Sequence, residues 1–532
     1  MIAFTNYKVR PLRVLAFVAA LSAGMSCAGV GAQTVTAVMQ SGLRVLDPII
    51  TTAYMTRNHG YMIYDTLLAT DADNKIRPQM AEKWDISSDK KTYTFTLRHG
   101  LKWHDGAPVK AEDCVASIKR WSEQDKMGQI LMTMVVGMKT VNDKSFQITL
   151  KQPTDLVLQA LAKPSGPPPF MMPKRIAETP STQAIKEYIG SGPFKFVAAD
   201  FKPGIKVVYE KNKDYVPRTE APSGLAGGKV VHVDRVEWVT MPDSLTTLNA
   251  LANGEIDYVE QVPYDLLPMV EGKAGIKVEV VDKLGYQTVY RFNHLHAPFN
   301  NKLLRQAAMY AVSQEDVMKA VVGNPKYYKT CPSVFGCGTE YSSTGGADMV
   351  VPSNIEKAKQ LLKEAKYDGT PVVILQPTDI NILAAQPVVI AQALRKAGFV
   401  VQLQAMDWQS VIVRRAIQKP PTEGGWSIFS TFNVIPDIVD PLRNFQIATN
   451  GKQAWFGWPD IPKIEQLRQQ FAHTTDAAER KKLSEEIQKL VYEEGVIVPL
   501  GEFSIPSAYR TSLSGILEGS VPVFWNMKKT GK

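Results

Sequence analysis

The sequence predicts an α/β protein that is divided into lobes. Alternating strand patterns and amphipathic helix patterns are mixed along the whole chain, as is typical of α/β and α+β proteins. The chain has 532 residues, whereas a single hydrophobic core stops growing at about 250–300 residues. Hydrophobic residues make up 45% of the chain and charged residues 21%, which excludes a disordered or fibrous protein. We therefore expect two or more lobes.

Residues 1–32 have the pattern of a secretory signal peptide. Basic residues lie near the start, an apolar run follows over residues 14–23, and Val30-Gly31-Ala32 forms a small-x-small cleavage site. The alternative is a lipid anchor at Cys27, for which Gly24-Met25-Ser26 is a poor context. No apolar stretch reaches the roughly 18 residues that a membrane-spanning helix needs. We expect cleavage after residue 32 and export to the periplasm.

The charge distribution argues against a nucleic-acid-binding protein. The formal net charge is +9, and Lys and Arg are interspersed with Asp and Glu along the chain. Nucleic-acid binding depends on clustered cations that face phosphates, and this sequence has no basic block. We expect no nucleic-acid partner.

Three cysteines lie beyond the predicted signal peptide. Cys331 and Cys337 enclose a short turn-rich segment, and export places them where thiols oxidise. We predict a disulfide between them that stabilises this loop by about 2 kcal/mol. A zinc site would need two further ligands nearby, which the sequence lacks. Cys114 is expected to be an unpaired, buried thiol.

Three segments have the period-2 alternation of half-buried strands. Residues 92–97 place Tyr93 and Phe95 on one face and threonines on the other. The same alternation recurs over residues 146–150 and 276–280. These segments predict strands of mixed sheets.

Two segments have the apolar stripe of an amphipathic helix. Residues 355–365 carry one such stripe, and Ser353 or Asn354 is placed to cap the helix. Residues 483–491 carry another, and Gly495 is expected to end that helix.

Short catalytic and cofactor motifs are absent from the sequence. There is no Gly-x-Ser-x-Gly elbow, no His-Glu-x-x-His, no phosphate-binding glycine-rich loop and no dinucleotide fingerprint. Gly190-Ser191-Gly192-Pro193 has the glycines but precedes a predicted strand, residues 194–197, where such a loop needs a helix. We expect no enzymatic activity and no cofactor.

Several motifs occur together and in order along the chain. They are Ala81-Glu82-Lys83-Trp84, Leu97-Arg98-His99-Gly100-Leu101-Lys102-Trp103-His104-Asp105-Gly106, Ala111-Glu112-Asp113, Gly190-Ser191-Gly192-Pro193-Phe194, Gly254-Glu255-Ile256-Asp257, Arg305-Gln306-Ala307 and Val498-Pro499-Leu500. This series resembles the family 5 extracellular solute-binding proteins, which include the dipeptide, oligopeptide and nickel receptors of ABC importers. The resemblance covers about residues 36–526.

The resemblance implies a two-lobed periplasmic-binding-protein fold of class II, in its large form with an extra subdomain in lobe I. Lobe I would comprise residues 33–286, completed by 502–532, and lobe II residues 287–501. The chain is expected to cross between lobes within residues 284–293 and again within 497–503. A ligand that contacts both lobes stabilises the closed state by its differential affinity.

The resemblance also implies an anchor for the ligand. In peptide-binding relatives, an Asp three residues before an acidic-Pro pair holds the α-ammonium group of the peptide, and Asp437 has that spacing before Asp440-Pro441. Opposite unit charges about 4 Å apart gain about 4 kcal/mol at an effective dielectric near 20, much of which desolvation offsets. Val434-Ile435-Pro436 replaces the small polar residues usual in relatives, so an ordinary loop acid is the alternative.

Further ligand contacts are expected from the order of the chain in relatives. One group follows the first strand at the expected edge of the cleft, another residue lies at the first crossing, and the rest lie in lobe II segments that face the cleft in relatives. The expected contacts are Met39, Gln40, Ser41, Asn293, Trp408, Trp426 and Asn433. Aromatic rings with a few polar groups suit ligand pockets, although an aromatic residue near a strand end is more often part of the core.

The aromatic residues of the motif series are expected to be structural. Trp84, Tyr93, Phe95 and Trp103 should fill a core or a turn, and His104-Asp105-Gly106 should form a turn whose glycine adopts a positive φ. A direct ligand role for His104 is the alternative.

Two pairs of chemically versatile residues are expected to be ordinary surface groups. Glu255 and Asp257 should lie at a surface junction between a helix and a strand. His294 and His296 have a spacing compatible with a nickel site, but a third nearby ligand is lacking.

These features predict the periplasmic substrate-binding receptor of an ABC importer. It would capture a peptide or a similar small polar solute by hinge closure and deliver it to permease subunits in the inner membrane. The alternatives are a nickel or metal-chelate receptor on the same scaffold, for which His294 and His296 would have to converge in the cleft, and a secreted hydrolase. We expect a monomer without a bound metal.

Overall fold

Two large β-sheets organise the computed structural model, which describes residues 33–531. The predicted signal peptide, residues 1–32, and Cys27 within it lie outside the described residues. We call the part built around the seven-stranded sheet the first lobe and the part built around the six-stranded sheet the second lobe. Among the helices of residues 33–531, none combines the length and the apolar character that a membrane crossing requires.

The seven-stranded sheet has the order β10-β11-β12-β1-β13-β21-β14. Its strands are β1 (Thr34–Val38), β10 (Phe194–Phe196), β11 (Lys206–Lys211), β12 (Arg235–Val239), β13 (Tyr258–Val259), β14 (Ile276–Glu279) and β21 (Ser507–Arg510). β1 pairs in parallel with both β12 and β13. The carboxyl ends of these three strands therefore meet at one edge of the sheet, where ligands bind in many α/β proteins.

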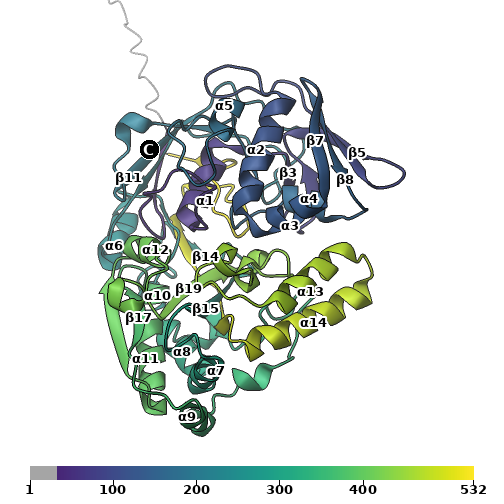
Figure 1. The fold of residues 1–532 in the computed structure, drawn as a ribbon. Helices are drawn as coiled ribbons and strands as arrows, with labels where there is room; N and C mark the ends of the chain where they lie inside the picture. The colour runs from purple at the N-terminus through teal and green to yellow at the C-terminus, as the bar shows by residue number, and fades with distance from the viewer. Residues whose placement is uncertain (1–32, 532) are drawn as a thin grey trace, which may run out of the picture. The chain divides into compact units, whose positions relative to one another are not determined.

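A four-stranded antiparallel sheet forms a separate layer of the first lobe. It has the order β5-β6-β8-β7. Its strands are β5 (Ala81–Ile86), β6 (Thr92–Leu97), β7 (Val135–Asn142) and β8 (Ser145–Leu150), beside α2 (Ala111–Gln124), α3 (Lys126–Met134) and α4 (Leu156–Leu161). Phe95 and Phe146 stack with ring centroids 5.2 Å apart, which confirms the faces expected from the alternation. In Figure 1, α2 to α4 lie beside β7 and β8.

The other elements of the first lobe are short. They are α1 (Tyr54–Ile63), α5 (Lys174–Ala177), α6 (Ser244–Asn253), η1 (Ala198–Asp200), η2 (Tyr264–Met269), the pair β2 (Asp65–Thr66) and β9 (Phe170–Met171), the pair β3 (Leu68–Thr70) and β4 (Ile76–Pro78), and the pair β22 (Leu513–Ser514) and β23 (Lys528–Lys529).

The six-stranded sheet has the order β16-β20-β15-β19-β17-β18. Its strands are β15 (Tyr286–Phe292), β16 (Tyr328–Lys329), β17 (Val372–Pro377), β18 (Val401–Met406), β19 (Ile428–Val434) and β20 (Val498–Phe503). The helices of the second lobe are α7 (Lys302–Ala311), α8 (Gln314–Val321), α9 (Ile355–Glu364), α10 (Asn381–Ala384), α11 (Gln386–Ala397), α12 (Trp408–Arg414), α13 (Pro462–His473) and α14 (Ala477–Glu493). β15 pairs antiparallel with β19 and β20, and β17 pairs in parallel with β18 and β19. In Figure 1, α13 and α14 run side by side.

The helix ends follow the chemistry expected from the sequence. Asn354 caps α9, because its side-chain oxygen accepts a hydrogen bond from the Lys357 amide at 2.9 Å. α14 ends at Glu493, and Gly495 follows with φ +60°. Gly106 has φ +90° in the predicted turn, and the Gly106 amide donates a hydrogen bond to the Trp103 carbonyl.

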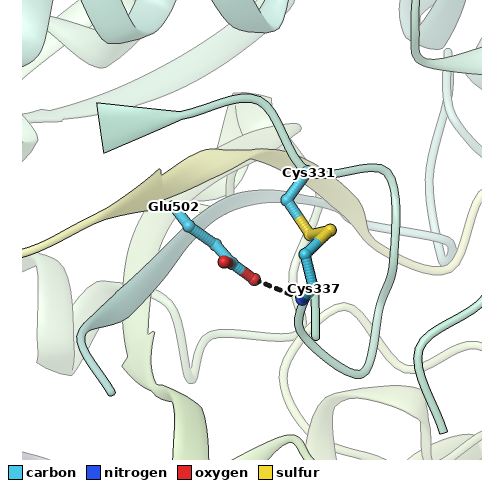
Figure 2. A group of neighbouring side chains, drawn as sticks. All are labelled: Cys331, Cys337 and Glu502. Carbon is cyan, nitrogen blue, oxygen red and sulfur yellow. Dashed lines mark hydrogen bonds between the residues drawn. A yellow bond between two sulfur atoms is a disulfide. The ribbon is translucent and has the colours of Figure 1, made fainter. Parts of the chain in front are cut away.

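The predicted disulfide between Cys331 and Cys337 is confirmed, with an S–S distance of 2.04 Å. Figure 2 shows Glu502 of β20 beside it, and the Glu502 carboxylate accepts a hydrogen bond from the Cys337 amide at 2.7 Å. The loop is therefore fixed to the six-stranded sheet by polar contacts as well as by the bond. Cys114 is buried and unpaired, as expected.

The expected surface position is wrong for Asp257. Glu255 is exposed, but Asp257 is only 4% exposed. Its Oδ2 accepts hydrogen bonds from the Thr36 amide at 2.9 Å and from Lys529 Nζ at 2.8 Å. The carboxylate therefore ties the start of β1 to the C-terminal segment, a long-range contact that the sequence does not show.

Candidate functional site

A cleft of about 700 Å³ lies between the first and second lobes. On the first lobe it is lined by the residues that follow β1, β12 and β13, which include Met39, Gln40 and Ser41. On the second lobe it is lined by the end of α8, by residues 378–382 and by Gln409. The parallel pairing of β1 with its two neighbours brings the three strand ends together, and this arrangement builds the first-lobe wall.

A smaller inner pocket of about 40 Å³ is continuous in its lining with the cleft. Gln40, Ser41, Ile380 and Gln409 line both. A site for one water needs roughly 10–15 Å³ of such volume, so the inner pocket holds only a few small groups in this arrangement. Entry of a larger solute requires the lobes to separate.

Several direct contacts cross between the lobes at the cleft. Gln409 Nε2 donates to the Gly42 carbonyl at 3.2 Å, and Asn381 Nδ2 donates to Ser244 Oγ at 3.3 Å. Arg44 and Asp407 form an ion pair at 3.8 Å, but the Arg44 side chain is 52% exposed. Exposed pairs contribute little, so these contacts leave the lobes free to move apart.

Asp437 is the buried centre of a network that joins the lobes. Its Oδ2 accepts hydrogen bonds from the Tyr54 hydroxyl at 3.0 Å and from Ser165 Oγ at 2.9 Å, both in the first lobe. The Tyr54 oxygen in turn accepts from the Val434 amide at 2.8 Å. Asp437 Oδ1 is buried and has no hydrogen-bond partner.

The charges around Asp437 only partly compensate its burial. Burial raises the pKa of the Asp437 carboxyl, and the positive charges of Arg57 and Lys163 act against that rise. Arg57 Nη1 donates to Ser165 Oγ at 2.7 Å, and its guanidinium lies 4.2 Å from the centre of the Tyr54 ring. The site therefore favours a further positive group beside Oδ1.

Glu260 fixes the first-lobe wall of the cleft from behind. The Gln40 amide donates to Glu260 Oε2 at 2.7 Å. Burial raises the pKa of Glu260 to about 7, and the hydrogen bond from Gln40 limits that rise.

The structure brings most of the sequence-predicted contacts to the cleft or the inner pocket. Met39 lines the cleft, Gln40 and Ser41 line both spaces, and Trp408 and Asn433 line the inner pocket. Asn433 Nδ2 is buried without a partner.

Three of the predicted contacts, Asp437, Trp426 and Asn293, line neither space. Trp426 is fully buried in an aromatic cluster with Phe429 and Trp458, and its indole N–H donates to the Arg415 carbonyl at 3.1 Å. Asn293 is 1% exposed, and its Nδ2 donates to the Trp426 carbonyl at 3.0 Å. Trp426 and Asn293 support the wall of the inner pocket from behind in this arrangement.

His294 and His296 do not converge. His294 Nε2 donates to the Gly495 carbonyl at 3.0 Å, and His296 Nε2 donates to the Gln418 carbonyl at 2.8 Å. Burial lowers the pKa of His294 well below its usual value. Within residues 33–531, the one trio of metal-capable side chains close together is Cys331, Cys337 and Glu502, and the disulfide occupies two of its members.

Several site residues have no signal in the sequence. Tyr54 and Ser165 are separated from Asp437 by 383 and 272 residues, so the pairing appears only in the fold. Arg415 follows Trp408 by seven residues, a spacing of about two helical turns, which places both on one face. This spacing indicates a shared helix face, but no local pattern in the sequence indicates that Arg415 is buried.

Comparisons with known proteins agree with this architecture. The family model described as bacterial extracellular solute-binding proteins, family 5 middle, matches residues 75–456. A probable peptide ABC transporter periplasmic-binding protein of Sinorhizobium fredii is 41% identical over 490 residues, which covers 92% of each chain. The dipeptide-binding protein DppE of Bacillus subtilis is 28% identical over 495 residues, 86% of this chain and 84% of the relative.

A solved structure has the same fold. The periplasmic binding protein DppA of Helicobacter pylori, in complex with the peptide STSA, aligns with a TM-score of 0.78 at 21% identity. The alignment covers 94% of this chain and 98% of that one. The likeness shows the two-lobed fold of periplasmic binding proteins. On the family match and the 41% identity, this chain belongs to the bacterial extracellular solute-binding proteins of family 5.

Proposed function

We propose that this chain is the periplasmic receptor of an ABC importer, and that it captures a peptide or a similar small polar solute between its lobes. The observation that carries the proposal is Asp437, a buried carboxylate between the lobes with one oxygen free of partners. The name of the Sinorhizobium fredii relative supports peptide as the solute class.

Asp437 is proposed to hold the α-ammonium group of the solute. An ammonium group has three N–H donors, and Oδ1 is available to accept one of them while Tyr54 and Ser165 remain on Oδ2. Because these two hydroxyls belong to the first lobe, closure and anchoring would be coupled. A solute held in this way stabilises the closed state by its contacts with both lobes.

The other predicted contacts are proposed as parts of the same site. The solute would contact Gln40, Ser41, Trp408 and Asn433 in the inner pocket, and it would contact Met39 in the outer cleft. Trp426 and Asn293 would act by supporting the wall. We propose no catalytic group and no cofactor, so that the solute leaves unaltered.

The division of the chain is proposed as 33–286 with 502–532 in lobe I, and 287–501 in lobe II. Sheet membership supports it to within two residues, since β15 begins at Tyr286 and β20 ends at Phe503. The four-stranded sheet would be the extra subdomain of lobe I. We also propose a monomer that is exported by cleavage of residues 1–32 and that meets permease subunits at the inner membrane.

The test is calorimetric titration of the mature protein with a panel of di- to oligopeptides, with nickel chelates and oligosaccharides as comparison solutes. We expect a peptide to bind and to raise the melting temperature, since stabilisation grows with ln(1 + [L]/Kd). Asp437→Asn retains the size and an acceptor for the two hydroxyls but removes the charge. It should weaken peptide binding by about tenfold to a hundredfold, as expected for a charged hydrogen bond.

Two controls make the result specific. Asp348→Ala removes an exposed carboxylate of the second lobe and should leave affinity unchanged. N-acetylation of the peptide should weaken binding to the parent protein and have little effect on the Asp437→Asn variant. Equal peptide affinity of the parent and Asp437→Asn proteins would refute the anchor, and binding of nickel chelates or sugars alone would refute the solute class.

A further inference from the structure

One group of contacts between the lobes lies outside the cleft and the inner pocket. It joins residues 151–155, the loop between β8 and α4 in the first lobe, to residues 472–480, which link α13 to α14 in the second lobe. Figure 1 shows α13 and α14 on the side of the molecule where α3 and α4 lie. Neither segment lines the cleft or the inner pocket, so these contacts have no part in holding the solute.

Thr154 is the buried centre of this group. Its Oγ donates a hydrogen bond to the Ala472 carbonyl at 3.0 Å, and the two residues are 4% and 1% exposed. Thr154 is also fixed within its own lobe, because its carbonyl accepts from the Tyr93 hydroxyl at 2.6 Å and its Oγ accepts from the Leu156 amide at 3.2 Å. The first lobe therefore presents the Thr154 O–H to the second lobe in a defined direction.

The acceptor is a carbonyl at the end of a helix. The last four carbonyls of an α-helix have no partner within the helix, and α13 ends at His473, so the Ala472 carbonyl needs a donor from elsewhere. Thr154 provides that donor from the opposite lobe. The segment around the acceptor is held by its own lobe, since Arg480 Nε donates to the Thr474 carbonyl at 2.7 Å. When the lobes separate, water can replace Thr154 at this carbonyl.

Two more exposed contacts surround the buried one. Asp155 and Arg480 form an ion pair at 2.9 Å, with side chains 46% and 13% exposed, and Gln152 forms a hydrogen bond with His473. Exposed pairs contribute little, whereas a buried acceptor that loses its donor costs the free energy of its desolvation. The bond from Thr154 therefore carries most of the preference for the closed arrangement at this place.

We propose that Thr154 and Ala472 form a latch that favours the closed arrangement and thereby sets the affinity of the receptor without touching the solute. This inference rests on the proposed closure of the lobes around a solute. The apparent Kd equals the intrinsic Kd divided by the fraction of the protein that is competent to bind. A weaker latch lowers the closed fraction, so it should raise the Kd of every solute by the same factor. That common factor distinguishes a latch from a residue that contacts the solute.

The test is calorimetric titration of Thr154→Val with at least two solutes of the panel that bind the parent protein. Valine keeps the shape of the side chain but has no O–H, so the closed arrangement leaves the Ala472 carbonyl buried and unpaired. We expect each Kd to rise by about fivefold to a hundredfold, with one factor for all solutes. Thr154→Ser retains the hydroxyl and should bind as the parent does.

Thr449→Val is the matched control. The Thr449 residue is also fully buried and its hydroxyl also donates to a carbonyl, that of Ile461 at 3.0 Å, but both residues belong to the second lobe. This variant should melt at a lower temperature than the parent and leave every Kd unchanged. Equal affinity of the parent and Thr154→Val proteins, or a change that differs from one solute to the next, would overturn the latch while the receptor function stands.

Hydrogen exchange of the ligand-free proteins tests the latch without a solute. The Val434 amide donates to the Tyr54 oxygen across the lobes at 2.8 Å, so its protection from exchange reports the closed fraction. This amide should exchange faster in Thr154→Val than in the parent and in Thr154→Ser, and exchange at the parent rate would overturn the proposal. If no solute of the panel binds, the proposed receptor function fails, and this measurement still decides whether Thr154 holds the lobes together.

Discussion

Glu260 illustrates how a single buried carboxyl connects the cleft to the solution pH. Glu260 lies directly behind the cleft wall, where its carboxylate accepts a hydrogen bond from the backbone amide of Gln40. Burial raises the pKa of Glu260 to about 7 from an ordinary value of 4.5. The folded protein therefore retains a proton on Glu260 at pH values where the unfolded chain has lost it. The positive charge of Arg57 and the hydrogen bond from Gln40 reduce this difference without removing it.

We expect protonated Glu260 to make its full contribution to the free energy of unfolding below about pH 4.5. This contribution should be lost as the pH rises to about 7. The loss should total up to about 3 kcal/mol at 1.36 kcal/mol per pKa unit. Glu260→Gln retains an acceptor for the Gln40 amide and does not titrate. Urea unfolding at a series of pH values should therefore give curves for the two proteins that diverge between pH 4.5 and 7 and run parallel above it. Identical pH profiles would show that Glu260 ionises normally.

Single residues were predictable where the sequence carries a local spacing. The resemblance to peptide-binding relatives implies Asp437 through its distance to Asp440-Pro441, and the structure places it in a buried network between the lobes. Its role as the ligand anchor stays a proposal. Tyr54 and Arg415 were missed, because burial and the absence of partners depend on segments far apart in the chain. Asp257 was misplaced for the same reason, since its partners Thr36 and Lys529 lie at opposite ends of the chain.

Secondary-structure elements were the most predictable level of the fold. The strand over residues 92–97 was expected from its period-2 alternation, and the helix that begins after Asn354 was expected from its apolar stripe and cap. These signals are local and therefore visible in one sequence. The order of strands in each sheet depends on long-range pairing, such as that of β1 with β12 and β13, and no local pattern encodes it.

The loop closed by Cys331 and Cys337 supports the turn that contains Asp437. Gly336 adopts φ +81°, and a side chain added there would meet Ile435, two residues before Asp437, at 3.3 Å. Asn444 Nδ2 also donates to the Val334 carbonyl at 2.9 Å. The disulfide loop and the turn that contains Asp437 therefore pack against each other.

Replacement of both cysteines, Cys331→Ser with Cys337→Ser, should lower the free energy of unfolding by about 2 kcal/mol, because the unfolded chain regains the freedom of the loop. Chemical denaturation of the two proteins measures the difference. A reductant should shift the parent protein by a similar amount and leave the double variant unchanged. An unaltered midpoint for the double variant would show that the bond does not stabilise the fold.

At the scale of the whole molecule, the chain belongs to a family of receptors whose two lobes enclose a solute. The contacts between the lobes include ion pairs, hydrogen bonds and aromatic pairs such as Tyr54 with Phe432. One of the charged pairs between the lobes, Asp155 with Arg480 at 2.9 Å, leaves the Asp155 side chain 46% exposed, and such a pair contributes little in water. Buried links are formed by the Asp437 contacts and by Thr154, whose Oγ donates to the Ala472 carbonyl at 3.0 Å. Asp437 Oδ1 is buried without a hydrogen-bond partner.

A bound solute that contacts both lobes would stabilise the closed state by its free energy of binding. A shift from 1% to 99% closed takes about 5.5 kcal/mol of preferential affinity for the closed state. An ammonium on Asp437 would contribute to this preference, because Asp437 meets Tyr54 and Ser165 of the first lobe only when the lobes are together. The resemblance to the family predicts the two-lobed fold and the anchor at Asp437, but the contacts of Asp437 with Tyr54 and Ser165 across the lobes are visible only in the structure.

Small-angle X-ray scattering of the mature protein, with and without a peptide that calorimetry shows to bind, tests closure most directly. We expect the radius of gyration to decrease on addition of the peptide, and the decrease to require a higher peptide concentration for Asp437→Asn. Recovery of the peptide intact by mass spectrometry should accompany the change. A scattering profile that stays the same at saturating peptide, or a peptide recovered as cleaved products, would contradict a receptor that closes on its solute and releases it unaltered.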